Sequence, residues 1–471
     1  MTLKIAFRNI LRNRRRSTMT LLAIAVGAVG VVLFGEFVRF VTAGLETNAV
    51  EKVGHLTVFR TGYFAFGAGN PAEYGIDDYP GVVDLIRRDP TLAPRLNVVT
   101  PIVALAGIAG NFDLDASKTF LGTGVVPSER DRLSRWDEHG VNRRRRETAS
   151  GLSDQDETRG VVGVGLARVL GLCEALKIGD CPPRPVPSRG HGSGPALDAD
   201  LSDLAGLART ERGPSATGGG GGDARPRLDL LAATAGGAPN VVSLFVDRTE
   251  RQGARELDDN FIAMHIRLAQ ALVYGRTPPK ATGIVVQLRH TADLELARAR
   301  LRALFAERHL DLEVHDFAEL QPFYTQAVGM FRAIFLFIAT IMSVIVLFTV
   351  VNTMGMSVME RTAEIGSARA MGVRRAGIRR LFVVEGLILG AIGASIGALL
   401  AQAIAAAVNH AGLTWSPPGQ ATAVPLEVLS AGAGGFVTRV WLGLVVAATL
   451  AALIPANRGA RLPVVDALRH V

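Results

Sequence analysis

The chain has 471 residues, of which 48% are hydrophobic and only 6% aromatic, and its formal net charge is +8. This length is too great for one small domain, and the apolar residues gather near both ends, which indicates a membrane protein with a polar middle. The positive charge comes mainly from arginines that flank apolar runs and do not alternate with aromatic residues. This arrangement argues against a nucleic-acid-binding protein.

Four apolar runs are long enough to cross a hydrocarbon core about 30 Å thick. The first run follows six basic residues and has no clear cleavage site after it. We therefore expect a retained signal-anchor and not a cleaved signal peptide. The predicted membrane helices are 18–41, 329–356, 381–408 and 439–457.

Arginines in the connecting segments set the predicted orientation. Connector 357–380 and tail 458–471 are rich in arginine, whereas connector 409–438 has neither lysine nor arginine. Because cytoplasmic loops carry the excess of positive charge, we expect both termini, including the basic segment 1–17, and connector 357–380 in the cytoplasm. Segment 42–328 and connector 409–438 are then extracytoplasmic.

Segment 42–328 mixes strand-like and helix-like patterns, which predicts a large α+β domain between the first and second spans. The predicted strands are 55–59, 100–110 and 282–288. Residues 291–309 predict an amphipathic helix with Thr291 as its N-cap. Residues 182–226 contain PPRPVP and five consecutive glycines, which predicts a flexible loop. A phosphate-binding loop would need a following Gly-Lys pair, which the sequence lacks.

Two cysteines, Cys173 and Cys181, lie in this polar segment with seven residues between them. Outside the cytoplasm they could form a local disulfide, and otherwise they would remain two free thiols. Two cysteines without a nearby histidine do not make a structural zinc site, so no metal site is expected.

No set of residues has the spacing of a catalytic site. The sequence contains neither a Walker A motif nor H-E-x-x-H, which disfavours a membrane-bound enzyme. GASIG at 393–397 matches G-x-S-x-G only formally, because Ser395 lies within an apolar helical run. Glu36 and Arg39 lie one turn apart at the end of the first span, where we expect them to pair or to face lipid headgroups.

Glycines recur every four residues along the third span, at Gly386 and Gly390 and again at Gly393 and Gly397. Small residues at this spacing let helix backbones approach closely. We expect them to pack this helix against another helix, within the chain or in a second copy.

Connector 357–380 contains the run MERTAEIGSARAMG, from Met359 to Gly372. This run resembles the signature M-E-R-x-x-E-I-G-x-x-R-A-M-G of the FtsX-like (MacB/LolC/LolE-type) ABC transporter permease family. The basic run before the first span, the segment VVGVGLARVLGLCEALKIGD and the arginine-rich tail are also similar to this family. One span, a large outer domain and three further spans resemble the layout of its lipoprotein-releasing and macrolide-exporting members.

The resemblance implies a permease subunit of an ABC transporter in a bacterial inner membrane, with no catalytic residues and no cofactor of its own. A separate ATPase subunit, in two copies, would bind ATP and magnesium and dock on the connector. The residues expected to couple to this ATPase are Met359, Glu360, Arg361, Glu364, Ile365, Gly366, Arg369, Ala370, Met371 and Gly372.

The resemblance further implies that ATP hydrolysis moves the extracytoplasmic domain for lipoprotein release or amphiphile export. Expected partners are a second permease copy or a paralogue, and a periplasmic adaptor or a lipoprotein substrate. The alternative function is a transmembrane regulator of a periplasmic hydrolase, as in the cell-division permeases of the family.

A coupling helix from Ser357 to Arg369 would place Glu360 and Glu364 one turn apart, with Arg361 three residues before Glu364. Gly366 and Gly372 would permit bends between this coupling helix and the third span.

Overall fold

The computed structural model divides the chain into two compact units. Unit 1 comprises Met1–Val53, Trp136–Arg145 and Asp316–Val471, and unit 2 comprises Gly54–Arg135 and Arg146–His315. The described residues are 2–12, 14–67, 69–141, 151–179, 181, 225–252, 255–415, 424–428 and 434–463. The predicted flexible loop 182–226 lies outside them except for its last two residues, and so does most of the tail.

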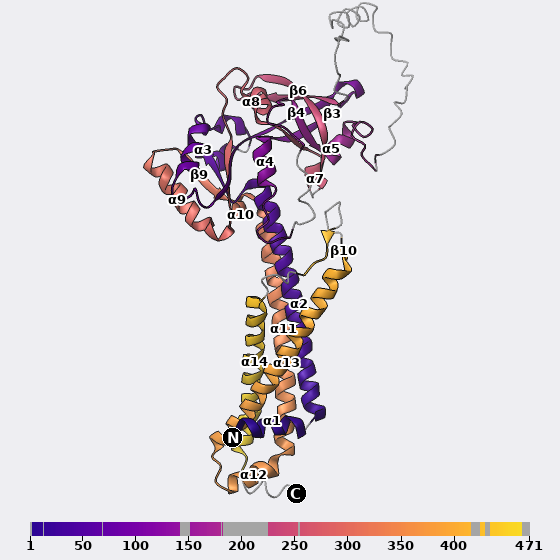
Figure 1. The fold of residues 1–471 in the computed structure, drawn as a ribbon, viewed down its shortest axis with the longest axis vertical. Helices are drawn as coiled ribbons and strands as arrows, with labels where there is room; N and C mark the ends of the chain where they lie inside the picture. The colour runs from indigo at the N-terminus through magenta and orange to yellow at the C-terminus, as the bar shows by residue number, and fades with distance from the viewer. Residues whose placement is uncertain are drawn as a thin grey trace, which may run out of the picture. The chain divides into compact units, whose positions relative to one another are not determined.

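Unit 1 is built mainly from long helices (Figure 1). Four of the described helices, α2, α11, α13 and α14, are long and apolar enough to cross a membrane, which confirms the predicted helical membrane protein. The helices of unit 1 are α1 (Thr2–Arg12), α2 (Arg14–Val53), α10 (Phe317–Leu320), α11 (Pro322–Glu360), α12 (Thr362–Ala370), α13 (Arg375–Ala411) and α14 (Gly434–Arg461). A short antiparallel pair, β10 (Thr414–Trp415) and β11 (Val424–Pro425), lies between α13 and α14 in the sequence.

Connector 357–380 is not one helix, which corrects the sequence-based expectation. Helix α11 ends before Arg361, α12 follows, and α13 begins after a turn that contains Gly372. Gly372 has a φ of +93°, a conformation that glycine adopts readily, so the bend expected there is present. The bend expected at Gly366 is absent, because Gly366 lies buried inside α12 and the helix breaks at Arg361 instead.

Unit 2 is organised around one sheet, in which nine strands of the described residues follow the order β3-β7-β4-β6-β5-β2-β8-β1-β9. Strand β2 pairs with β8 along its first half and with β3 and β5 along its second half. Because β3 also pairs with β7, strands β2, β3, β7, β4, β6 and β5 form a closed ring. The strands are β1 (Leu56–Arg60), β2 (Leu96–Asn111), β3 (Ala116–Val125), β4 (Arg159–Gly163), β5 (Arg227–Ala233), β6 (Pro239–Glu250), β7 (Phe261–His265), β8 (Gly283–Leu288) and β9 (Leu312–Asp316).

Two large hydrophobic clusters and a smaller one stabilise the described part of unit 2. One large cluster joins the strand ring to α5 and α8 and contains the buried side chains of Phe120 and Leu228. The other large cluster joins β1 and β8 to α3 and α9 and contains Leu56, Ile86 and Leu301. The helices of unit 2 are α3 (Tyr79–Arg88), α4 (Pro127–Leu133), α5 (Val164–Val169), α7 (Arg255–Asp258), α8 (Ile266–Tyr274) and α9 (Leu294–Glu307).

The strands predicted from β-branched runs correspond to β1, β2 and β8, but the predicted start of the helix 291–309 is wrong. Residues Thr291–Asp293 form a 3-10 turn before α9, so Thr291 is not the N-cap. The Thr291 hydroxyl lies 3.2 Å from Nε2 of His55. The Thr291 side chain therefore makes a tertiary contact with His55 in place of the predicted N-cap hydrogen bond.

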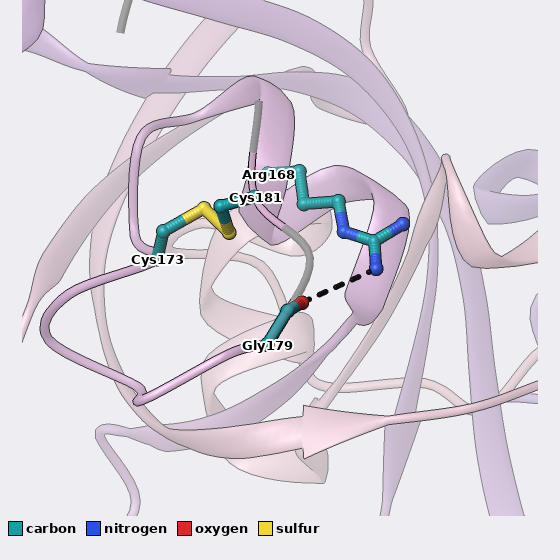
Figure 2. The surroundings of a disulfide bond; sticks show 4 residues. All are labelled: Arg168, Cys173, Gly179 and Cys181. Carbon is teal, nitrogen blue, oxygen red and sulfur yellow. Dashed lines mark hydrogen bonds between the residues drawn. A yellow bond between two sulfur atoms is a disulfide. The ribbon is translucent and has the colours of Figure 1, made fainter. Parts of the chain in front are cut away.

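Cys173 and Cys181 are joined by a disulfide in unit 2, and their Cα atoms are 6.2 Å apart (Figure 2). Figure 2 also shows Arg168 of α5 donating to the carbonyl oxygen of Gly179, at 3.5 Å, within the same loop. The disulfide closes the short loop that follows α5.

Candidate functional site

Helix α12 is held against the ends of the membrane helices by one buried face and one arginine. Ile365 is 5% exposed, and Gly366 beside it is also buried. Nη1 of Arg369 donates to the carbonyl oxygen of Leu462 at 2.6 Å and to that of Ala460 at 3.4 Å. Since Ala460 lies in the last turn of α14, these bonds tie the connector to the fourth membrane helix.

Arg361 stands at the break between α11 and α12 and joins two carboxylates. Its Nε donates to Oε2 of Glu364 at 3.0 Å, and its Nη1 lies 3.6 Å from Oε2 of Glu385 on α13. The side chains of Arg361 and Glu385 are only 11% and 7% exposed. The Arg361 guanidinium also lies over the ring of Phe382, 5.8 Å from its centre. The break in the helix therefore coincides with this buried arginine and not with a glycine.

Two arginines near the start of the chain complete the charge network. Nη2 of Arg12 lies 2.5 Å from Oε1 of Glu364, and Arg16 forms an ion pair with Glu360. Both carboxylates that the sequence assigns to ATPase docking are therefore engaged within this chain. We call the set Arg12, Arg16, Glu360, Arg361, Glu364 and Glu385 the connector charge network.

The surroundings of Glu364 shift its titration. Burial would raise the pKa of this carboxyl, but hydrogen bonds from Arg361 and Arg12 outweigh that effect and hold the pKa below its usual range. The stabilisation is fully present above the pKa of the unfolded chain and is lost as pH falls through the lower pKa of the folded chain. Acid thus weakens the contact between α12 and the start of the chain.

Part of the predicted coupling segment remains free on the surface. Met359 and Met371, which flank α12 on its two sides in the sequence, are 70% and 80% exposed. Ala370 and Gly372 are exposed as well. The segment thus has one face fixed to the helix bundle and a second, partly apolar face that is uncovered.

The four glycines of the third span lie in contacts between helices of the same chain. A Cβ atom on Gly386 or Gly390 would lie 2.5 or 2.9 Å from an alanine Cβ of α14. A Cβ on Gly393 would lie 2.8 Å from the Cβ of Ile24 on α2, and one on Gly397 would lie 2.5 Å from a backbone oxygen of α2. Helix α13 therefore packs closely on both neighbours, a choice that the sequence left open.

The environment of Glu36 and Arg39, the polar residues of the first span, differs from the expected one. Glu36 is fully buried and accepts a hydrogen bond from Nε2 of Gln402 on α13 at 2.6 Å, so it does not face headgroups. The guanidinium of Arg39 lies 5.7 Å from the centre of the Phe436 ring. Ser395 accepts a hydrogen bond from Nε1 of Trp441 at 3.0 Å, which agrees with a packing role.

Sequence reasoning missed three members of the connector charge network, namely Arg12, Arg16 and Glu385. The arginines were interpreted only as topology signals. Glu385 had a detectable signal, because a carboxylate at the edge of an apolar span is costly unless it has a partner. Within the described residues, no cluster of three or more His, Cys, Asp or Glu side chains could hold a metal ion.

Known proteins resemble the part of the chain that contains this site. Residues 336–464 match the family model described as FtsX-like permease C-terminal. The part of the chain that contains the site is therefore an FtsX-like permease domain. The chain is 32% identical over 133 residues to the macrolide export ATP-binding/permease protein MacB of Escherichia coli, and this match covers 28% of the chain and 21% of that relative.

Two further relatives agree with this family. The MacB protein of Neisseria gonorrhoeae is 29% identical over 188 residues, or 39% of the permease and 27% of the relative. The lipoprotein-releasing system transmembrane protein LolC of Neisseria meningitidis serogroup B is 27% identical over 164 residues, or 35% of the permease and 38% of the relative. The matches thus span about a fifth to two fifths of the relatives' length.

Proposed function

We propose that this FtsX-like permease is the membrane subunit of an ABC transporter and that ATP hydrolysis takes place in a separate ATPase subunit. Two copies of the ATPase would bind a pair of permeases, formed by two copies of this chain or by this chain and a paralogue. ATP and magnesium would be bound by the ATPase, and this chain would carry no cofactor. Helix α12 would receive the motion of the ATPase.

The observation that carries this proposal is the two-faced attachment of α12. Within α12, Glu364 pairs with Arg12 of α1, and Arg369 donates to the carbonyl oxygen of Leu462 beyond α14. Just before α12, Glu360 pairs with Arg16 of α2, and Arg361 pairs with Glu385 of α13. The methionines flanking α12, Met359 and Met371, are exposed. A helix that is attached to the bundle and carries an exposed methionine just before and just after it suits a lever that a partner protein pushes.

The proposed orientation places connector 357–380 and the two chain ends in the cytoplasm and unit 2 outside it. The distribution of arginine among the connectors supports this orientation. The disulfide between Cys173 and Cys181 supports it independently, because disulfides persist in oxidising compartments such as the periplasm.

The proposed cargo is a lipoprotein or another amphiphile, extruded when unit 2 moves. Unit 2 begins directly after α2 in the sequence, and α10 and α11 follow its end, so motion of these helices would reach it through the chain. The names of the relatives support this class of cargo, since one belongs to a lipoprotein-releasing system and another to macrolide export. A periplasmic adaptor would be a further partner.

The decisive experiment measures ATP hydrolysis by the reconstituted permease–ATPase complex. Met359→Glu with Met371→Glu is expected to lower the ATPase activity at least tenfold, about 1.4 kcal/mol or more, because charged side chains are introduced into an apolar contact. The same variant should lose co-purification with the ATPase while its own thermal stability is unchanged.

The matched control is Phe112→Glu, which adds a carboxylate at an exposed apolar side chain of unit 2. This variant should keep full activity and full binding of the ATPase. Unchanged hydrolysis and binding in the double methionine variant would refute docking at this segment.

A further inference from the structure

Helix α1 presents apolar side chains to two different surroundings. Ala6 and Ile10, one turn apart, are 0% and 6% exposed, and Ile10 belongs to the hydrophobic core of unit 1. Ile5, Phe7 and Leu11 are 43%, 50% and 50% exposed. The first pair fastens α1 to the helix bundle, and Phe7 and Leu11, which are four residues apart, lie together on a side away from it.

The position of α1 explains what can cover these exposed side chains. Figure 1 shows α1 lying crosswise to the long helices, at the end of the bundle where α2 begins. Only the short interval around residue 13 separates it from α2, which is itself apolar enough to cross a membrane. A helix placed in this way, with aromatic and aliphatic residues on one side, suits the boundary between lipid headgroups and acyl chains.

The arginines of this segment fall into two groups. Arg12 and Arg16 are paired with carboxylates of the connector charge network. Arg8, Arg14 and Arg15 are exposed, and none of the three pairs with a carboxylate among the residues that the structure describes. Arg8 neighbours Phe7 and Leu11 on α1, and Arg14 and Arg15 begin α2, so this end of the chain keeps uncompensated positive charge close in sequence to exposed apolar side chains.

We propose that α1 and the first turn of α2 form a binding surface for anionic phospholipids, with Arg8, Arg14 and Arg15 receiving the headgroups and Phe7 and Leu11 entering the acyl region. Charge complementarity and continuity with a membrane span argue for this occupant. Each cation near an anionic membrane surface favours binding several-fold, and lipid burial of the apolar side chains fixes the helix at the depth where headgroups lie. The proposal rests on the membrane-spanning part of the proposed function and not on the ATPase.

The test places a fluorescent probe on α1 of the full-length chain, without the ATPase. The structure shows no free cysteine among its described residues, so Phe7→Cys supplies a single thiol for an environment-sensitive dye. The protein is reconstituted in phosphatidylcholine vesicles that contain equal small fractions of nitroxide-labelled phosphatidylglycerol or nitroxide-labelled phosphatidylcholine. Quenching reports which lipid is enriched beside α1.

The anionic quencher is expected to be at least about fivefold more effective than the zwitterionic one, the effect of roughly one cation near the surface. This preference should disappear in Arg8→Gln/Arg14→Gln/Arg15→Gln and remain when the same three positions carry lysine. A control that removes equal charge from exposed arginines of unit 2, Arg60→Gln/Arg276→Gln/Arg308→Gln, should keep it.

Three outcomes would overturn the proposal. Equal quenching by both lipids would show that α1 has no preference for negative charge. No quenching by either lipid would show that α1 lies outside the headgroup region. A preference that survives the triple glutamine substitution would assign the charge recognition to other residues.

Discussion

At the scale of single residues, Arg361 is the buried charge at the break between α11 and α12. Its side chain is buried against Glu385, and the geometry is that of an ion pair at 3.6 Å without a hydrogen bond between the two atoms. Removing one partner of a buried ion pair leaves an uncompensated charge, whereas replacing both by apolar residues is often tolerated. The two positions should therefore respond very differently to single and double substitution.

Arg361→Met is expected to lower the free energy of unfolding by about 3 kcal/mol or more, because Glu385 stays buried without its cation. Arg361→Met/Glu385→Leu should recover most of this loss. Chemical unfolding of the purified full chain in detergent measures both values. Arg308→Met, at an exposed position of unit 2, serves as the control and should change stability little. A double variant no more stable than the single one would contradict the assigned pairing.

At the scale of elements, α13 is the helix around which the membrane bundle packs. It contacts α14 through Gly386 and Gly390 and α2 through Gly393 and Gly397. The glycine spacing predicted close packing, but the identity of both partners came from the tertiary structure. Where no neighbour is near, glycine has no such purpose and weakens a helix by roughly 1 kcal/mol relative to alanine.

This contrast predicts opposite effects for one chemical change. Gly397→Ala should destabilise the chain by about 1–3 kcal/mol, because the new methyl group would lie 2.5 Å from a backbone oxygen of α2. Gly443→Ala on α14 meets nothing within 4 Å and should leave stability unchanged or raise it slightly. Thermal unfolding in detergent compares the two variants. Equal shifts in melting temperature would argue against close packing of α13 on α2.

At the scale of the whole molecule, the disulfide and the charged connector make opposite demands on their surroundings. Cys173–Cys181 belongs to unit 2 and needs an oxidising compartment, whereas α12 belongs to unit 1 and is proposed to meet a cytoplasmic ATPase. The proposed orientation meets both demands, because it puts the disulfide outside the cytoplasm and α12 on the cytoplasmic side.

Single added cysteines test this arrangement in intact bacteria. Ala306→Cys on α9 should react with a membrane-impermeant maleimide in whole cells, and Ser367→Cys on α12 should react only after lysis, since both positions are exposed in the fold. Cys173 and Cys181 should stay unreactive until a reductant is added. The reverse labelling pattern would contradict the proposed orientation.

Cys173→Ser/Cys181→Ser should lose about 2–3 kcal/mol of stability in unit 2.

The sequence by itself determined the number of apolar helices, the β-branched strands β1, β2 and β8, and the segment at the candidate site. These features depend on local composition and on the solvent that each segment meets, so they can be read from short stretches. The tertiary structure alone decided the strand ring of unit 2, the helix break at Arg361 and the pairing of Arg12 with Glu364, which are 352 positions apart. Such contacts arise when distant segments are packed together, and no local pattern specifies which carboxylate a given arginine will meet.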